Sequence, residues 1–267
     1  MLKDITLGQY FPGDTIVHRL DPRTKLILVI VYIAALFFAK YYLSYGIMLL
    51  VLITCVTISK IRPKTLLRGL KPLLFIIIFT AVINIFYTEG RVIFQLWIFK
   101  ITIEGIERAL FMVARIMMLI TGTFLLTYTT SPIALTDGME SLLSPLKKIK
   151  APVHEFSMMM SIALRFIPTL IEETDKIMSA QKARGADFET GKLTDRARAL
   201  LPLLVPLFIS AFRRADELGT AMESRCYTGG EGRTKMKVLR FKAADYIALF
   251  LGAVVLAGVI IISRAGL

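Results

Sequence analysis

The chain has little of the residue types that hold metal ions or disulfide frameworks. Its 267 residues include two cysteines and two histidines. Cys55 lies in an apolar run and Cys226 in a basic, polar one, so a disulfide framework is not expected, and a structural zinc site usually needs four Cys or His ligands. His154-Glu155 begins the H-E-x-x-H pattern of zinc peptidases, but the second ligand is replaced by Met158. We therefore expect no metal site, and we assign neither histidine a role.

A phosphate-binding loop is also missing. The segment Gly185 to Leu193 contains Gly-Lys, but five residues separate its glycines, and Leu193 stands where the loop needs Ser or Thr. Gly229-Gly230 and Gly232 are typical of a flexible turn. We therefore expect the chain to bind no cofactor, to hydrolyse no ATP itself and to be no enzyme.

Apolar residues, in contrast, are abundant. They make up 55% of the chain, and the mean hydropathy is +0.66, above what soluble domains usually show. The composition indicates a multi-span membrane protein. The apolar runs long enough to be considered as spans are Leu26–Ala39, Leu43–Ile58, Leu73–Tyr87, Ala109–Tyr128 and Tyr246–Ser263. The segment before the first run is too long and too acidic for a simple leader, so we expect this run to remain as a span.

The charges predict the orientation. Lys and Arg outnumber Asp and Glu by 33 to 20. With the N-terminus inside, the short inner segments 1–25 and 59–72 carry four and five Lys or Arg, against one near residue 40 and three in 88–108 outside. Short cytoplasmic loops favour such an excess. The sequence therefore predicts an all-α polytopic bundle with a cytoplasmic N-terminus.

This topology divides the chain into three parts. We predict N-terminal transmembrane helices over 1–128, a cytoplasmic region over 129–245 and a C-terminal transmembrane helix over 246–267. The basic charge of the middle region is explained largely by positive-inside topology and suits contact with anionic membrane lipids. Nucleic acid is disfavoured, because the basic residues are dispersed among apolar stretches without an aromatic-rich reading face.

Two long helices are predicted in the middle region, over 154–184 and 197–225. Each is apolar first and polar afterwards, and Pro168, Pro202 and Pro206 are expected to kink or divide them. Their lengths exceed what a membrane span needs, since a residue adds about 1.5 Å. We expect them to be stiff rods.

The two predicted helices end alike. Each end carries one arginine between small neighbours, in Ala183-Arg184-Gly185 and in Ser224-Arg225-Cys226. Small flanks allow close approach of another surface, and a guanidinium offers a rigid fork of donors for a carboxylate. An arginine near a helix C-terminus is also favoured by the helix dipole alone, so this simpler explanation stays open.

Few polar residues lie within the predicted spans. They are Asn84, Arg115 and several threonines. Ion-coupled carriers usually hold carboxylates within the membrane, so a stand-alone secondary transporter is disfavoured without being eliminated. For Arg115, a structural hydrogen bond to a neighbouring helix is at least as well supported as a functional role.

The sequence resembles the transmembrane T component of energy-coupling factor (ECF) transporters, a branch of the ABC importers. The resemblance covers nearly the whole chain. The residues that carry it are His18-Arg-Leu-Asp-Pro-Arg-Thr-Lys25, Leu164-Arg-Phe-Ile-Pro168, Ala180-Gln-Lys-Ala-Arg-Gly185 and Ala221-Met-Glu-Ser-Arg-Cys226. The segment from Gln9 to His18 looks most like the shared-module subgroup, which serves several vitamin-specific partners.

The resemblance implies a non-catalytic subunit in a prokaryotic plasma membrane. It implies that two cytoplasmic ATPase subunits, which bind ATP and Mg²⁺, dock on the two coupling helices. The ATPase-binding residues would be Ala183, Arg184, Gly185, Ser224, Arg225 and Cys226. A small membrane-embedded S component would capture a vitamin or another micronutrient, and ATP-driven motion would reorient it. A membrane scaffold without transport is the other alternative.

Overall fold

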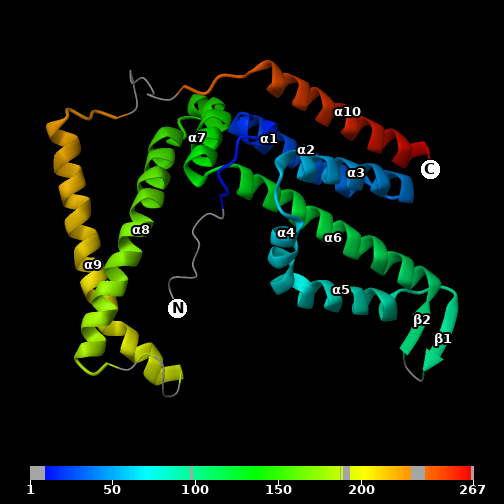
Figure 1. The fold of residues 1–267 in the computed structure, drawn as a ribbon, viewed down its shortest axis with the longest axis horizontal. Coiled ribbons are helices and arrows are strands. Elements are labelled where there is room, and N and C mark those ends of the chain that lie inside the picture. Colours follow the sequence, from blue (N-terminus) through cyan, green and yellow to red (C-terminus); the bar gives the residue numbers. More distant parts are fainter. Residues whose placement is uncertain (1–9, 97–98, 187, 189–192, 230–237, 266–267) are drawn as a thin grey trace. The chain divides into compact units, whose positions relative to one another are not determined.

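The computed structural model describes residues 10–96, 99–186, 188, 193–229 and 238–265. The chain forms two compact units, one that includes residues 140–238 and one that combines residues 8–139 with 239–267. The predicted all-α class is confirmed, and Figure 1 shows the helices. Their bounds are α1 Ile16–Arg19, α2 Pro22–Phe38, α3 Tyr42–Ser59, α4 Pro63–Leu70, α5 Leu74–Tyr87, α6 Ile103–Thr129, α7 Pro132–Leu143, α8 Val153–Ala183, α9 Leu193–Ser224 and α10 Ala243–Ala265.

Four helical stretches among the described residues are long and apolar enough to cross a membrane. They are Tyr42–Ser59, Pro63–Tyr87, Ile103–Thr129 and Ala243–Ala265. Each contains one of the predicted apolar runs, and most of their side chains are not buried inside the protein. The remaining run forms α2, whose 17 residues reach about 26 Å and lie at the short end of the range for a span. That α2 crosses the membrane stays a prediction.

The core of the larger unit joins α2, α3, α6 and α10. The side chains that form it are Ala35, Leu36, Ala39, Tyr45, Met48, Leu52, Met118 and Val259. In Figure 1, α10 runs alongside α2 and α3. Gly252 permits this close approach, since a Cβ there would lie 2.6 Å from the Leu28 side chain. Small residues at helix contacts are typical of membrane bundles.

Arg115 makes the structural contacts proposed for it. From α6, its Nε donates to the Tyr45 hydroxyl at 2.9 Å, and its Nη2 donates to the Ala39 carbonyl at 3.1 Å. Both acceptors belong to neighbouring elements of the bundle, and the Ala39 carbonyl follows the end of α2. Because a charged group within a membrane bundle needs such partners, the role of Arg115 is to join helices.

A short β-hairpin, which the sequence did not predict, lies between α5 and α6. Strand β1 (Val92–Leu96) pairs antiparallel with β2 (Phe99–Thr102), with Leu96 opposite Phe99. The hairpin leads directly into α6, where the Thr102 hydroxyl accepts a hydrogen bond from the Gly105 amide at 3.0 Å and caps the helix.

The smaller unit contains the two long helices, close to their predicted bounds. Helix α8 begins one residue before the predicted start, and α9 begins at Leu193, four residues early. The internal prolines divide neither helix: Pro168 lies inside α8, and Pro202 and Pro206 lie inside α9. Figure 1 shows that the yellow first part of α9 and its remainder run in different directions, as expected for a helix that contains prolines.

Candidate functional site

The end of α8 is closed by a specific backbone motif. The Gly185 amide donates to the Lys182 carbonyl at 3.0 Å, and the Ala186 amide donates to the Gln181 carbonyl at 3.0 Å. Gly185 has a φ of +89°, in the left-handed region. This pair of bonds around a left-handed residue is the Schellman motif, which satisfies the last carbonyls of a helix. Arg184 is the last residue before the left-handed turn.

The end of α9 has the same geometry. The Cys226 amide donates to the Glu223 carbonyl at 2.8 Å, and the Tyr227 amide donates to the Met222 carbonyl at 3.0 Å. Cys226 has a φ of +54° and therefore takes the place of Gly185. The resemblance between the two helix ends, which in the sequence is an arginine between small neighbours, thus extends to the backbone hydrogen bonds.

Both arginines project from these ends into solvent. All six residues predicted to bind ATPases are exposed: Ala183, Arg184, Gly185, Ser224, Arg225 and Cys226. Within the part of the chain that the structure describes, neither guanidinium has a hydrogen-bond or ion-pair partner. Two guanidinium forks held at the tips of stiff helices can each bind a carboxylate on another molecule.

The left-handed residues give a testable difference between the two ends. A non-glycine residue in this region costs roughly 1 kcal/mol. Gly185→Ala should therefore destabilise the end of α8 by about 1 kcal/mol, although a Cβ there would meet open space. Cys226→Gly should stabilise the end of α9 by about 0.5–1 kcal/mol. Hydrogen exchange of the last turns, followed by mass spectrometry, measures both effects.

Gly219→Ala is the matched control for this comparison. Gly219 lies in the interior of α9, and a Cβ there would also meet open space. The same substitution should stabilise the helix by about 1 kcal/mol, because glycine is unfavourable in a helix interior. If Gly185→Ala and Gly219→Ala had effects of the same sign, the assignment of the Schellman motif at Gly185 would be wrong.

The motif His18–Lys25, which helped to carry the resemblance, lies in the larger unit and holds helix ends together. Asp21 caps α2 by accepting the Arg23 amide at 2.9 Å. Asp245, in the first turn of α10, accepts the Asp21 amide and the Lys242 amide, both at 2.8 Å. One carboxylate thus caps α10 and joins it to the start of α2.

Lys25 joins the same motif to the end of α6. Its Nζ donates to the Thr129 carbonyl at 2.9 Å, to the Thr130 hydroxyl at 3.1 Å and to the His18 carbonyl at 3.1 Å. Lys25 is 5% exposed and Asp245 only 1%. A cation at the last carbonyls of a helix also interacts favourably with the helix dipole. The motif therefore holds the starts of α2 and α10 and the end of α6 together.

Arg23 adds side-chain contacts to Asp21 and Phe241. Its Nε and Nη2 each donate to one Asp21 oxygen at 3.0 Å, and its guanidinium lies over the Phe241 ring at 4.0 Å. Burial by itself would raise the pKa of Asp21, but the hydrogen bonds and the positive charge of Arg23 outweigh it and lower the pKa. Asp21 therefore stays ionised, and its carboxylate accepts hydrogen bonds from both the Arg23 amide and the Arg23 guanidinium.

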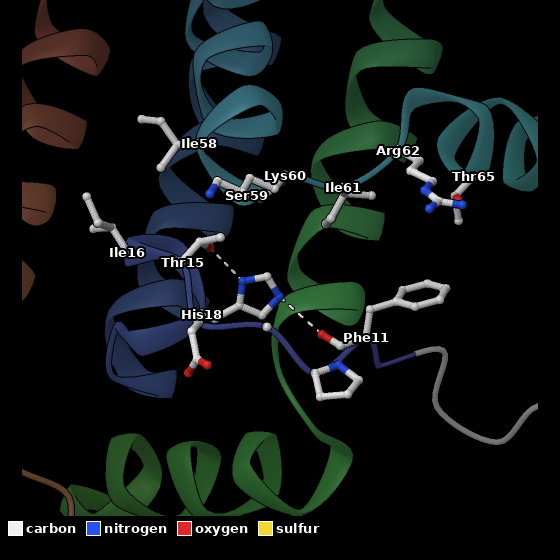
Figure 2. A pocket seen from close by; sticks show the side chains of 13 residues that line it. Phe11, Thr15, Ile16, His18, Ile58, Ser59, Lys60, Ile61, Arg62 and Thr65 are labelled. Atoms are coloured by element: carbon white, nitrogen blue, oxygen red, sulfur yellow. Dashed lines mark hydrogen bonds between the residues drawn. The ribbon is translucent and has the colours of Figure 1, made fainter.

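His18 lies beside a hollow of about 750 Å³ between the N-terminal segment and the α3–α4 connection, shown in Figure 2. Its Nδ1 is 2.6 Å from the Thr15 hydroxyl, and its Nε2 donates to the Phe11 carbonyl at 3.1 Å. Burial lowers the pKa of His18, and the charge of Lys25 acts in the same direction. A neutral ring with Nε2 protonated satisfies both contacts, so His18 is a structural residue.

The second histidine also has a local partner. His154 Nδ1 is 3.1 Å from a Glu140 carboxylate oxygen, and both belong to the smaller unit. Among the described residues, no three His, Cys, Asp or Glu side chains are grouped so that they could hold a metal ion. The candidate site is the pair of arginine tips, because Arg184 and Arg225 are exposed at helix ends with the same cap.

The apolar helices of membrane-spanning length identify the chain as a polytopic membrane protein. The family model "CbiQ: Cobalt transport protein" matches residues 13–236, and the chain belongs to this family. Similar relatives are named energy-coupling factor transporter transmembrane protein EcfT. The relative from Thermosediminibacter oceani is 54% identical over 98% of this chain and 99% of its own length. The one from Bacillus subtilis is 48% identical over 99% of this chain and 100% of its own.

Proposed function

We propose that this chain is the energy-coupling transmembrane subunit of an ECF-type importer. The observation that carries the proposal is the pair of exposed arginines, Arg184 and Arg225, at the ends of two long helices with the same cap geometry. The EcfT names of relatives that match over nearly their whole length support it. Each tip docks on one cytoplasmic ATPase subunit, and the chain itself carries out no hydrolysis.

The docking chemistry follows from the arginine fork. Each guanidinium enters a groove of an ATPase subunit and binds a carboxylate there with two parallel hydrogen bonds. The small flanking residues let the groove walls close on the helix end. ATP and Mg²⁺ are bound by the ATPases, whose closure displaces both helix ends. Rigid α-helices transmit such displacements as one body.

The apolar surface of α9 suits a membrane-embedded partner. Leu201, Val205 and Phe208 are exposed on its first half, while the polar second half leads to the Arg225 tip. We propose that an S component, which captures a vitamin or another micronutrient, packs on apolar helices of this chain and is reoriented when the tips move. By its likeness to the shared-module subgroup, the chain serves several S components.

The proposed topology has a cytoplasmic N-terminus in a bacterial plasma membrane. The excess of Lys and Arg in the short segments 1–25 and 59–72 supports this orientation. It also places the arginine tips on the side where ATP is available. Thiol labelling of single-cysteine variants in intact cells tests it, with exposed positions on α8 expected to react only after the membrane is opened.

Affinity purification of the tagged chain in mild detergent tests the proposed function. Two ATPase subunits and a small apolar membrane protein should be recovered with it, and the purified set should take up substrate into liposomes when ATP is supplied. Uptake by this chain alone under an ion gradient would instead establish a secondary transporter. Recovery of partners without any substrate uptake would favour a scaffold.

A further inference from the structure

The two arginine-tipped helices are joined to each other by one carboxylate. Glu173 of α8 accepts a hydrogen bond from the Ser210 hydroxyl of α9, and its second oxygen accepts one from Arg214 Nη2 at 3.1 Å. The Arg214 guanidinium also lies over the Phe166 ring at 5.6 Å. The Glu173 and Arg214 side chains are 26% and 28% exposed. We refer to Glu173, Ser210 and Arg214 as the clasp.

The clasp lies at matching positions of the two helices. Glu173 and Arg214 are 41 residues apart, which is the offset that relates Arg184 to Arg225 and Gly185 to Cys226. Each arginine tip therefore follows its clasp residue by eleven residues, or about 16 Å of helix. The helices are thus fastened to each other at a point equally far from both tips.

A carboxylate with two specific donors contributes to this register in addition to the packing of the helices. A displaced clasp would leave a half-buried Glu173 without its donors, which costs free energy. Both carboxylate oxygens are used, and both donors come from the same helix, α9.

We propose that the clasp is a positioning device that couples the two tips. It sets the register at which α8 and α9 cross, so that a displacement imposed on one tip is passed to the other and to the apolar half of each helix. Without it, each ATPase still docks on its own tip, but the motions of the two tips are no longer coordinated. The inference rests on the proposed function and adds the residues that transmit the motion.

The test uses the complete complex in liposomes, with Glu173→Gln and Arg214→Gln as separate variants. The matched controls are Glu172→Gln and Arg213→Gln, which remove the same charges from exposed neighbours on the same helices. We expect normal recovery of the ATPases and normal ATP hydrolysis in all four. Substrate moved per ATP hydrolysed should fall roughly fivefold in the two clasp variants alone. The exchange Glu173→Arg with Arg214→Glu should restore most of the loss.

A distance measurement on the full chain tests the clasp without the partners. Spin labels are attached at Ser179→Cys and Thr220→Cys in a Cys55→Ser, Cys226→Gly background. Both positions are exposed and hold equivalent places on the two helices, so the labels report the distance between the last parts of α8 and α9. The distance distribution should broaden with Glu173→Gln and not with Glu172→Gln. Unchanged distances, or unchanged transport per ATP, would overturn the proposal. If the unmodified chain recovers no ATPase, the proposed function fails, while the distances still decide on the clasp.

Discussion

The double variant Arg184→Ala, Arg225→Ala loses its ATPase subunits during purification. Each guanidinium is exposed in the free chain and has no partner among the described residues, so it is available to a carboxylate of a docked subunit. Truncating one member of such a pair once it is buried in an interface costs on the order of 2–5 kcal/mol. Since about 1.4 kcal/mol corresponds to a factor of ten in affinity, recovery of the ATPases should fall at least tenfold.

The single variants separate the two tips. Arg184→Ala should release one ATPase position and Arg225→Ala the other, while Arg184→Lys should have an intermediate effect because lysine keeps the charge but not the planar fork. Arg213→Ala is the control, since it removes an exposed arginine from the same helix as the Arg225 tip at a distance from that tip. The readout is the amount of each ATPase per tagged chain after a fixed wash.

The variant chains must also be shown to fold. The side chains of the two arginines make no intramolecular hydrogen bond within the described residues, so detergent-purified variants should elute and melt as the unmodified chain does. Full ATPase recovery by a folded double variant would remove docking from the role of these residues. An equal loss of ATPase recovery with Arg213→Ala would show that recovery depends on the net charge of the chain and not on the arginines at the helix ends.

The ends of α8 and α9 could be predicted from the sequence, because the residues that form each helix end are adjacent in the chain. The helix stop at Gly185 and the arginine between small residues lie within one helical turn. The structure adds that Cys226 adopts the left-handed conformation of Gly185. A cysteine in that conformation is unusual enough that only the likeness of the two helix ends could have suggested it.

Contacts between residues far apart in the sequence escaped prediction. Asp21 is held by Asp245, 224 residues later, and no pattern within His18–Lys25 indicates that partner. In the sequence, the motif therefore indicates only the family resemblance. Its structural role, in which Asp21 and Lys25 hold three helix ends together, is visible only in the structure. The β-hairpin was missed for another reason, because its short strands continue apolar sequence between two helices and carry no clear turn signal.

The clasp could be predicted from the sequence only in part. The offset that relates the two tips also pairs Glu173 with Arg214 in the sequence alone, so the sequence contains two opposite charges at equivalent positions of the two helices. What the sequence does not provide is the crossing of α8 and α9 at that point, which depends on the packing of their side chains.

We expect Lys25→Met to destabilise the protein strongly. Lys25 is buried, and its three hydrogen bonds satisfy the Thr129 carbonyl, the Thr130 hydroxyl and the His18 carbonyl. Methionine fills a similar volume but leaves these acceptors unpaired, and it removes one of the two positive charges, those of Lys25 and Arg23, that act on the buried Asp245. Breaking a buried charge network by removing one member costs roughly 3–5 kcal/mol, or about 6–20 °C in the apparent melting temperature for a chain of this size.

Arg19→Gln is the matched control, because it removes a positive charge from the same motif at the surface. The Arg19 and Asp14 side chains are 70% and 97% exposed, and their charged atoms are 4.0 Å apart. Such exposed pairs contribute little to stability. Melting in detergent, followed by size-exclusion chromatography after heating, should show a large loss for Lys25→Met and almost none for Arg19→Gln. The double variant Lys25→Met, Asp245→Asn should lose less than the sum of its single variants, because each removes the charge that the other leaves uncompensated. Additive losses would show that Lys25 and Asp245 act independently. A Lys25→Met variant as stable as Arg19→Gln would show that the Lys25 hydrogen bonds do not hold the three helix ends together.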